Sequence, residues 1–372
     1  MATNTEHLTL WKAVHPGAIL KRELDARGIS QKQLANTMDI SVSHFNEVIR
    51  GKRPVNTELA LLLEKFLGIP YKTWMKLQSE YDYDVTAIAE RDRENARASE
   101  YEAACREQVN LAAIYKRLNI TAATAVERVK SLKSVLPFDL LDIGEYKLGV
   151  AGLYKHSEKV QIDEKNMLSW LVLNKCETLK YDVSALPEFE SGSAESAAEE
   201  IADYANKQEL TPAILEGILN RHGIAYLVVR KLDKAPVDAF CTMRDGHPFI
   251  TVTYRYNDID KLAFDVLHEL CHIERHLGNG QESFVALDGM DYSHDPRERE
   301  ANEFARNALI PMKDWEKILR TKSQSLLLNK VVATIAAAAQ NLGYSPSIAV
   351  ARYKHETQNY STNLYRSKKI EQ

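Results

Sequence analysis

Apolar residues recur every three or four positions along several long segments of the chain, which is the spacing of one face of an α-helix. The clearest segment covers residues 261–276, KLAFDVLHELCHIERH. Its apolar positions are Leu262, Val266, Leu267, Leu270 and Ile273. No proline or glycine interrupts the segment before Gly278, so the pattern predicts one amphipathic helix.

Helical spacing also dominates the middle of the chain. Residues 84–120 are charged, rich in alanine and free of helix breakers, and predict one long helix. Further helical stretches are expected at 122–134, 164–180 and 194–219, with loops at VLPFD, ALPEFESGSAES and KQELTP. The acidic run from Glu188 to Glu200 predicts a solvated surface.

From Gly223 the pattern changes to runs of apolar and β-branched residues, which predict strands at IAYLVVRKL, VDAFCTMRDG and HPFITVTYR. Asp245-Gly246 is a strong signal for a tight hairpin between the last two. We expect residues 250–255 to lie near an edge of the sheet; an interior position is the open alternative. The predicted fold class is therefore mainly α with a small β-sheet, an α+β architecture.

Residues 28–55 contain the helix start and stop signals that are typical of a helix-turn-helix. Ser30 is suited to cap a helix from about Gln31 to Met38, and Ser41 to cap the next helix after a turn at Asp39 and Ile40. A compact apolar set would fix the angle between the two helices: Leu34, Ala35, Ile40, Phe45, Val48 and Ile49. The polar residues assigned to DNA contacts are Gln31, Ser43, His44, Asn46, Arg50, Lys52 and Arg53.

The length of 372 residues predicts two or three domains, which we place at 1–78, 79–220 and 221–372. The middle one reads as a helical module of undefined role. Residues 1–75 hold ten Lys/Arg and seven Asp/Glu, a balance of +3 that leaves −7 for the rest of a chain with net charge −4. Four scattered cysteines, no long apolar stretch and no signal-peptide layout predict a cytoplasmic protein without a membrane segment.

The helix at 261–276 carries the pattern His-Glu-x-x-His at His268, Glu269 and His272. Histidines four residues apart project from nearly the same face, so both can bind one metal ion, with the glutamate within reach of a water. A helix that carries two histidines by chance is the alternative. His276 is excluded as a third ligand, because eight residues span about 12 Å along a helix.

A second amphipathic helix is predicted at residues 297–311, with Ala301, Phe304, Ala305, Ala308 and Leu309 on one face. Glu298 lies at the edge of this face and Asn302 lies one turn later. A carboxylate ligand followed by a polar residue that orients a zinc-bound imidazole is a gluzincin-like arrangement. The alternative is a solvated glutamate between Arg297 and Arg299.

Together, HELCH and EREANEFARNALIP resemble the two motifs of the ImmA/IrrE family of zinc metallopeptidases, the second of which runs Glu-x-x-Ala-Asn-x-x-Ala and ends in proline. The resemblance implies that His268, His272 and Glu298 bind zinc and that Glu269 is catalytic. Cys271 departs from the family's usual Gly or Ala, and its small apolar side chain fits a core position. The segment LGYSPSIAVARYKHE resembles the part that follows the peptidase core in fused members.

Residues 15–78, from HPGAILKREL to LGIPYKTWMKLQ, resemble the five-helix XRE-type repressor fold, and within it the HigA/VapI-like antitoxins. The two resemblances imply a DNA-binding transcriptional regulator with a zinc endopeptidase that cleaves a protein, either a repressor or the chain itself. The alternative is an antitoxin and autorepressor whose metal domain binds a partner toxin or a ligand without catalysis. Either way we expect a homodimer on a palindromic operator in double-stranded DNA.

In the peptidase interpretation, bound zinc would lower the pKa of its water from about 15.7 towards 7, and Glu269 would take the proton. The candidates for stabilising the oxyanion are Tyr254, Arg255, Tyr292 and His294. A polar loop with Asp288, Asp291, His294 and Asp295 joins the two metal-bearing helices. It is either a lid over the substrate or a solvated connection.

Overall fold

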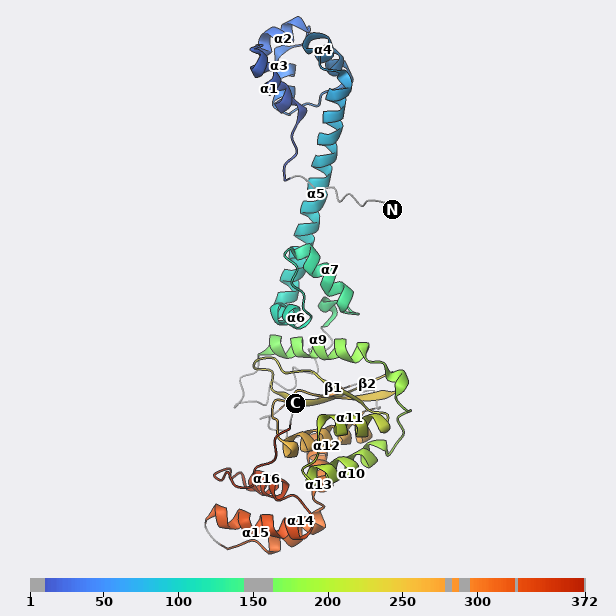
Figure 1. Cartoon of the computed structure of the whole chain (residues 1–372), viewed down its shortest axis with the longest axis vertical. Coiled ribbons are helices and arrows are strands. Elements are labelled where there is room, and N and C mark those ends of the chain that lie inside the picture. Colours follow the sequence, from blue (N-terminus) through green and yellow to red (C-terminus); the bar gives the residue numbers. More distant parts are fainter. Residues whose placement is uncertain (1–10, 144–162, 278–282, 288–294, 325–326, 371–372) are drawn as a thin grey trace. The chain divides into compact units, whose positions relative to one another are not determined.

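The computed structural model describes residues 11–143, 163–277, 283–287, 295–324 and 327–370, which are coloured in Figure 1. None of the helices in these ranges combines the length with the apolar character that a membrane span requires. The described chain is mostly helical and contains one small sheet. The predicted fold class is confirmed.

The N-terminal domain is formed by α1 (Pro16–Arg27), α2 (Gln31–Thr37), α3 (Val42–Ile49), α4 (Thr57–Leu67) and the start of α5 (Tyr71–Gln108). Both predicted caps are confirmed: the hydroxyls of Ser30 and Ser41 accept hydrogen bonds of 3.2 Å from backbone N–H groups at the starts of α2 and α3. Asp39 adopts the left-handed conformation, with φ of 57°, in the turn between them.

The two helices of the motif are held by a core that includes Leu34, Ala35, Phe45, Val48 and Ile49, with Ile40 packed at its margin. The first helix of the domain, α1, approaches α3 closely at Gly17. A Cβ atom at that position would lie 1.9 Å from the carbonyl oxygen of Val48, so only glycine fits there.

The predicted single helix over residues 84–120 is wrong at both ends. Helix α5 already begins at Tyr71, and it stops at Gln108, before α6 (Leu111–Arg117). Asn110 causes the break, because its side chain accepts a hydrogen bond of 3.1 Å from the N–H of Ala113 and so caps α6. The same residue also bonds to Ser169 and Asn166, far along the chain, and these partners cannot be read from local sequence.

Three further helices lie close to the predicted stretches: α7 (Ala125–Val135), α9 (Glu164–Lys180) and α10 (Ser193–Asn206), followed by α11 (Pro212–Arg221) after the expected loop. Short 3₁₀ turns occupy Leu140–Ile143 and Val183–Ala185. The acidic run is only partly a solvated surface. Ala194 and Ala197 within it are fully buried in the core, and Glu195 and Glu200 form ion pairs.

Four strands form one sheet in the order β1-β3-β2-β4, where β1 is Ala225–Val228, β2 is Val237–Arg244, β3 is His247–Val252 and β4 is Ser283–Leu287. The hairpin at Asp245 and Gly246 is confirmed, with φ of 51° and 80°. The expectation that residues 250–255 lie near an edge is wrong. Strand β3 pairs on both sides, and its residues from Phe249 to Val252 are buried. Among the described strands the edges are β1 and β4, and β4 was not predicted.

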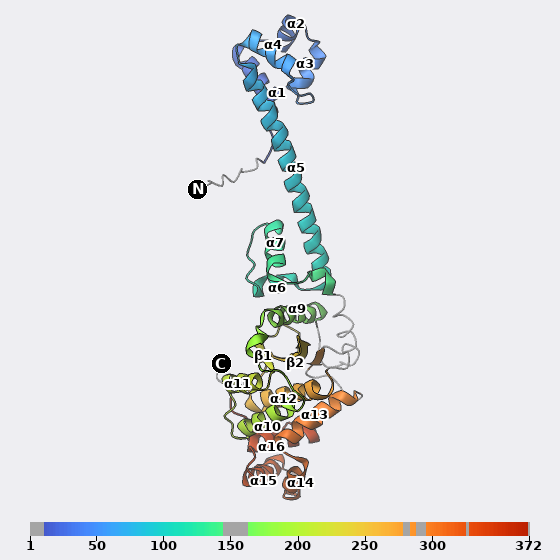
Figure 2. The ribbon, with the colours of Figure 1, turned by 90° about the vertical axis from the view of Figure 1, so that its right-hand side faces the viewer.

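Helices cover both faces of this sheet (Figures 1 and 2). One face packs against α9, whose Trp170 donates an indole hydrogen bond of 3.0 Å to the carbonyl of Val229. The other face packs against α12 (Ile259–Arg275), with α10 and α11 beside it. Because α12 lies between the sheet and α13 (Pro296–Leu309), its residues from Val266 to Ile273 are all buried.

Three helices follow α13: α14 (Met312–Arg320), α15 (Leu328–Asn341) and α16 (Pro346–Thr357). After α16 the chain returns to the start of α12. The backbone N–H of Ile370 donates to the carbonyl of Asn257 over 2.8 Å, and that of Ile259 donates to the carbonyl of Lys368 over 3.1 Å. Residues 358–370, the C-terminal segment, thus lie beside α12.

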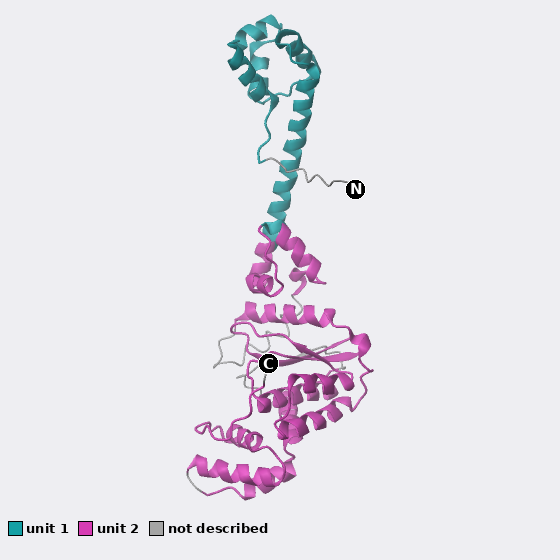
Figure 3. Cartoon of the chain, viewed as in Figure 1, with its two compact units in different colours: residues 1–101, 124–126 teal, residues 102–123, 127–372 magenta. Residues whose placement is uncertain are grey.

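The chain divides into two compact units (Figure 3). One unit comprises Met1–Tyr101 with Thr124–Val126, and the other comprises Glu102–Ala123 with Glu127–Gln372. The helix-turn-helix lies in the first unit, and the helix with the His-Glu-x-x-His pattern lies in the second.

Candidate metal centre and nucleic-acid surface

Two helices that pack against each other bring His268, His272 and Glu298 together. The histidines lie one turn apart on α12. Helix α13 begins at Pro296, because the Asp295 side chain caps it by accepting a hydrogen bond of 2.9 Å from the N–H of Arg297. This start places Glu298 in the first turn of α13.

The three side chains converge on one point. The Nε2 atoms of His268 and His272 are 3.0 Å apart. The Glu298 carboxylate lies 3.1 Å from Nε2 of His268 and 3.5 Å from Nε2 of His272. All three residues are buried, and their ligand atoms form a cluster that could hold a metal ion.

The donor set and its spacing fit zinc. Atoms bound about 2.0–2.1 Å from a tetrahedral zinc lie about 3.3 Å from one another, and the observed distances lie on either side of that value. Oε2 of Glu298 is buried and lies 3.1 Å from Nε2 of His268, and no other donor among the described residues reaches it. Both atoms therefore face a common point, as ligands of one ion do.

The electrostatics favour a cation at this point. Burial, followed by the charge of neighbouring His268, lowers the pKa of His272 to about 2, so its imidazole is neutral and can act as a ligand. Burial also acts to lower the pKa of His268. The hydrogen bond to Glu298 and the charge of Glu269 oppose it, and the net pKa is raised. The carboxylates of Glu298 and Glu269 thus stabilise a positive charge at this point, which either a proton or a metal ion can carry.

Glu269 is fully buried next to the cluster. Burial raises the pKa of its carboxyl to about 7, although the charge of His268 and the thiol of Cys241 act to lower it. No nitrogen or oxygen donor in the described part of the chain reaches its two oxygens. A buried carboxyl with a raised pKa and no nitrogen or oxygen donor bound to it is suited to accept and return a proton.

The outer nitrogen of His272 contacts His276, which sequence reasoning considered only as a metal ligand. The two Nδ1 atoms are 2.9 Å apart, and Nε2 of His276 lies 3.2 Å from the carboxylate of Glu300.

Asn302 is half-buried one turn after Glu298 and lines a cavity together with Glu298. Within the described ranges it makes no hydrogen bond to either imidazole. Its proposed orienting role stays a prediction.

A cavity of about 1110 Å³ opens beside the cluster. Its walls come from α12, α13, α16 and the C-terminal segment, and they include His268, Glu269 and Glu298. Sequence reasoning missed several polar residues of this lining: Asp238, Lys261, Asp265, His355, Tyr360, Tyr365 and Arg366. The lining residues from the C-terminal segment belong to no local sequence motif. They reach the cavity only because the chain returns to the start of α12.

A partly buried ionic group lies one to two turns before His268 on α12. Lys261 is 2.7 Å from Asp265 and 2.9 Å from Asp238 on β2. Burial raises the pKa of Asp265 to about 6, although the charge of Lys261 acts to lower it. Arg255 also lies 3.6 Å from Asp238, so the two carboxylates of this group face two cations.

Two of the four oxyanion candidates are described. The hydroxyls of Tyr254 and Tyr226 form a hydrogen bond of 2.6 Å. Tyr254 does not line the cavity. Arg255 lies 3.6 Å from Asp238, which does line it. Tyr292 and His294 lie outside the described residues, as do Asp288 and Asp291 of the proposed lid, whereas Asp295 caps α13.

The residues assigned to DNA contacts lie at the surface of the helix-turn-helix. Ser43, Arg50, Lys52 and Arg53 are exposed, and Gln31, His44 and Asn46 are half-exposed. Arg53 forms an ion pair with Glu47 on α3. The remaining cations and the short polar side chains of α3 are open to a ligand.

Comparisons with known proteins give two family matches. The family model described as an IrrE N-terminal-like domain, which belongs to a peptidase family, matches residues 220–354. The family model described as a helix-turn-helix matches residues 20–74. Virulence-associated protein I of Dichelobacter nodosus is 34% identical over 84 residues, which cover 22% of this chain and 75% of that protein. The uncharacterized HTH-type transcriptional regulator YddM of Escherichia coli (strain K12) is 29% identical over 66 residues, or 18% of this chain and 70% of that protein.

Solved structures give similar coverage. The Pseudomonas aeruginosa antitoxin HigA with the higBA promoter is 32% identical over 22% of this chain and 89% of that chain, with a TM-score of 0.21. An addiction module antidote protein of a HigA family from Coxiella burnetii is 30% identical over 22% of this chain and 90% of that chain, also with a TM-score of 0.21.

Proposed function

Because the chain belongs to the XRE-type helix-turn-helix family and carries an IrrE N-terminal-like peptidase domain in residues 220–354, we propose that it is a DNA-binding regulator whose second domain is a zinc-dependent endopeptidase. One observation carries the catalytic part of this proposal. The ligand atoms of His268, His272 and Glu298 converge beside the buried carboxyl of Glu269, at the wall of a cavity.

In this function His268, His272 and Glu298 hold the metal. Zinc, when bound, supplies Lewis acidity that polarises a peptide carbonyl and lowers the pKa of water. Glu269 accepts a proton from the attacking water and delivers it to the amine that leaves. Burial raises the pKa of its carboxyl, which makes the carboxylate a stronger base. The burial of these groups keeps bulk water from competing for the proton.

The substrate we propose is a protein, either a repressor or this chain itself. The cavity of about 1110 Å³ is large enough for several residues of an extended peptide. Its lining carries both signs of charge and includes the aromatic side chains of Phe264, Tyr360 and Tyr365. Cleavage of a repressor would then change the output of the promoter that it controls.

The helix-turn-helix supplies the DNA-binding part of the proposal. Helix α3 presents Ser43, His44 and Asn46 to base edges, while Arg50 and Lys52 contact phosphates. Operators read by this motif are two-fold symmetric, so we propose a homodimer on a palindromic site.

The second candidate function is that of an antitoxin that represses its own promoter and binds a partner toxin. The likeness to HigA-type proteins favours it, and it needs no catalysis.

The variant Glu269→Gln separates the two candidates, because glutamine keeps the shape of glutamate without its basicity. Wild type, Glu269→Gln and the control Glu303→Gln are expressed in the source cells, and protein fragments and promoter output are followed under inducing stress. Glu303 is an exposed residue on the opposite face of α13 from Glu298.

The peptidase proposal predicts that Glu269→Gln still holds zinc and binds DNA but loses cleavage by 10²- to 10⁴-fold, while the control behaves as wild type. If Glu269→Gln gives the same fragments and the same promoter output as wild type under every stress tested, catalysis is not the function of the domain, and the antitoxin candidate remains.

A further inference from the structure

A line of hydrogen-bonding groups leads away from the candidate metal centre through His276 and Glu300, which do not line the cavity of about 1110 Å³. It starts at Nδ1 of His272, which is 2.9 Å from Nδ1 of His276. The next contact in the line joins Nε2 of His276 to the carboxylate of Glu300, at a distance of 3.2 Å. His272 lies in the last turn of α12, His276 is the C-cap residue of that helix, and Glu300 lies near the start of α13.

The Glu300 carboxylate and a neutral His276 together set the direction of the two hydrogen bonds in this line. A carboxylate only accepts, so Nε2 of His276 carries a proton and donates it to Glu300. In a neutral imidazole the other nitrogen then has a lone pair, so Nδ1 of His276 accepts the hydrogen bond from Nδ1–H of His272. With its proton on Nδ1, a neutral His272 has its lone pair on Nε2, the atom that faces His268 and Glu298.

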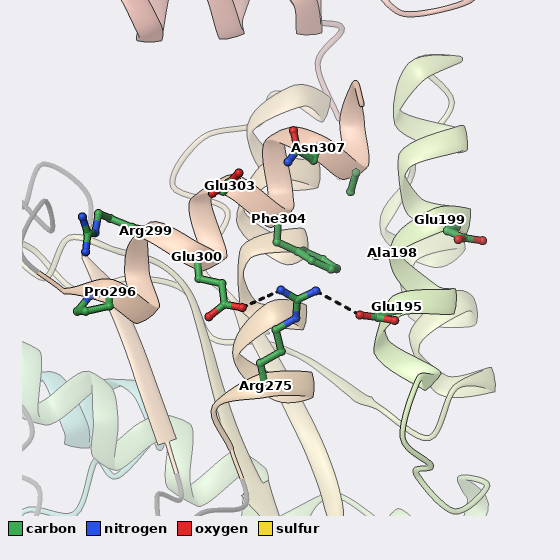
Figure 4. A pocket seen from close by; sticks show the side chains of 11 residues that line it. Glu195, Ala198, Glu199, Arg275, Pro296, Arg299, Glu300, Glu303, Phe304 and Asn307 are labelled. Atoms are coloured by element: carbon green, nitrogen blue, oxygen red, sulfur yellow. Dashed lines mark hydrogen bonds and ion pairs between the residues drawn. The ribbon is translucent and has the colours of Figure 1, made fainter. Parts of the chain in front are cut away.

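The end of the line is itself held in place. Arg275 donates a hydrogen bond of 2.7 Å to Glu300 and lies 3.3 Å from Glu195 on α10. Figure 4 shows the guanidinium between these two carboxylates, with the ring of Phe304 beside it at 5.2 Å from the centroid. The ion pairs connect α10, α12 and α13, so Glu300 belongs to a group of charged side chains contributed by three helices.

We propose that His276 is a positioning residue for the metal centre: it holds the proton of His272 on Nδ1 and thereby keeps Nε2 available as a ligand. This inference rests on the proposed function only in taking His268, His272 and Glu298 as the metal site. Without an acceptor at residue 276, the hydrogen bond of 2.9 Å that favours the proton on Nδ1 of His272 is lost. The tautomer with the proton on Nε2, where it competes with the metal, then gains population. Outer partners of this kind change metal affinity by about 10–100-fold.

The test is the zinc affinity of the full chain, measured by competition with a chromophoric chelator. His276→Leu removes the acceptor and keeps an apolar side chain of similar bulk, and we expect it to weaken zinc binding about 10–100-fold. His276→Asn is the conservative variant, because its amide oxygen can accept from Nδ1–H of His272, and we expect it to recover most of that loss. Glu303→Gln on α13, which does not contact His276, should bind zinc as wild type does.

The stability of each metal-free variant is measured by urea denaturation alongside, so that a structural defect is seen separately. If His276→Leu binds zinc as tightly as wild type, the inference is overturned and the proposed function stands. If Leu and Asn weaken zinc equally and both lower metal-free stability, His276 has only a structural role, which also overturns the inference. If wild type binds no zinc, or Glu298→Ala binds it as wild type does, the proposed metal site fails and the inference fails with it.

Discussion

Glu102, near the end of α5, allows a prediction whose size follows from the contacts. Its side chain is only 3% exposed. It accepts hydrogen bonds of 2.7 and 3.0 Å from the guanidinium of Arg128, 2.7 Å from Arg106 and 2.9 Å from the hydroxyl of Tyr115. The bonds from Arg128 are the largest cause that lowers the pKa of Glu102 to about 2 from its ordinary 4.5, against the opposing effect of burial.

This difference of about 2.5 in pKa corresponds to about 3 kcal/mol, at 1.36 kcal/mol for each pH unit. Arg106 is more than half exposed, and solvent screens its share. We therefore expect Glu102→Gln to lower the free energy of unfolding by about 2–3 kcal/mol at pH 7. Because the folded-state pKa is depressed, the stabilisation is fully present above pH 4.5 and is lost as the pH falls through 2.

The assay is urea denaturation of wild type and Glu102→Gln at pH 7 and pH 3. At pH 3 less than half of the difference in unfolding free energy should remain. Glu100→Gln on the same helix is the control, because Glu100 is exposed, and it should change stability by less than about 0.5 kcal/mol. A loss below about 0.5 kcal/mol for Glu102→Gln at pH 7, or a difference that is equally large at pH 3, would refute the reasoning.

Other predictions concern the two candidate sites. Glu298→Ala should lose most of the zinc found in the wild-type protein by elemental analysis; an unchanged zinc content would show that the ligand assignment is wrong. Replacing Ser43, His44 and Asn46 together by alanine should abolish specific operator binding in footprinting and leave the zinc content unchanged; equal protection by wild type and variant would remove α3 from the DNA interface. Gly17→Ala places a Cβ atom 1.9 Å from a backbone oxygen of α3. It should destabilise the N-terminal domain by at least about 1–3 kcal/mol, measured as a lower thermal midpoint of that domain, and an unchanged midpoint would contradict this packing.

Local chemistry explains the parts of the fold that the sequence predicted well. The serine caps of α2 and α3, the Asp245-Gly246 hairpin and the bounds of α9 each depend on residues within a few positions of one another. The sequence also proposed three ligands, and the structure places their atoms within 4.8 Å of one another. Their roles remain predictions.

The errors arise where distant residues decide the outcome. Asn110 ends α5 with the help of α9, which begins more than fifty residues later. Strand β3 is interior because β1 pairs with it in parallel and the five-residue β4 joins β2 on the far side. His276 was judged by its distance along a helix, which excludes it as a ligand but says nothing of a contact with the outer nitrogen of His272.

The C-terminal segment has a practical consequence for anyone who prepares this protein. Residues 358–370 contain no helix, and their described backbone bonds to the start of α12 come from Lys368 and Ile370. Yet Tyr360 and Tyr365 from this segment line the cavity beside the metal cluster. Trimming by a contaminating protease would therefore remove one wall of the cavity and leave every proposed metal ligand in the protein. A sample that is fully loaded with zinc can still have an altered substrate pocket, so its intact mass should be checked before any activity is compared.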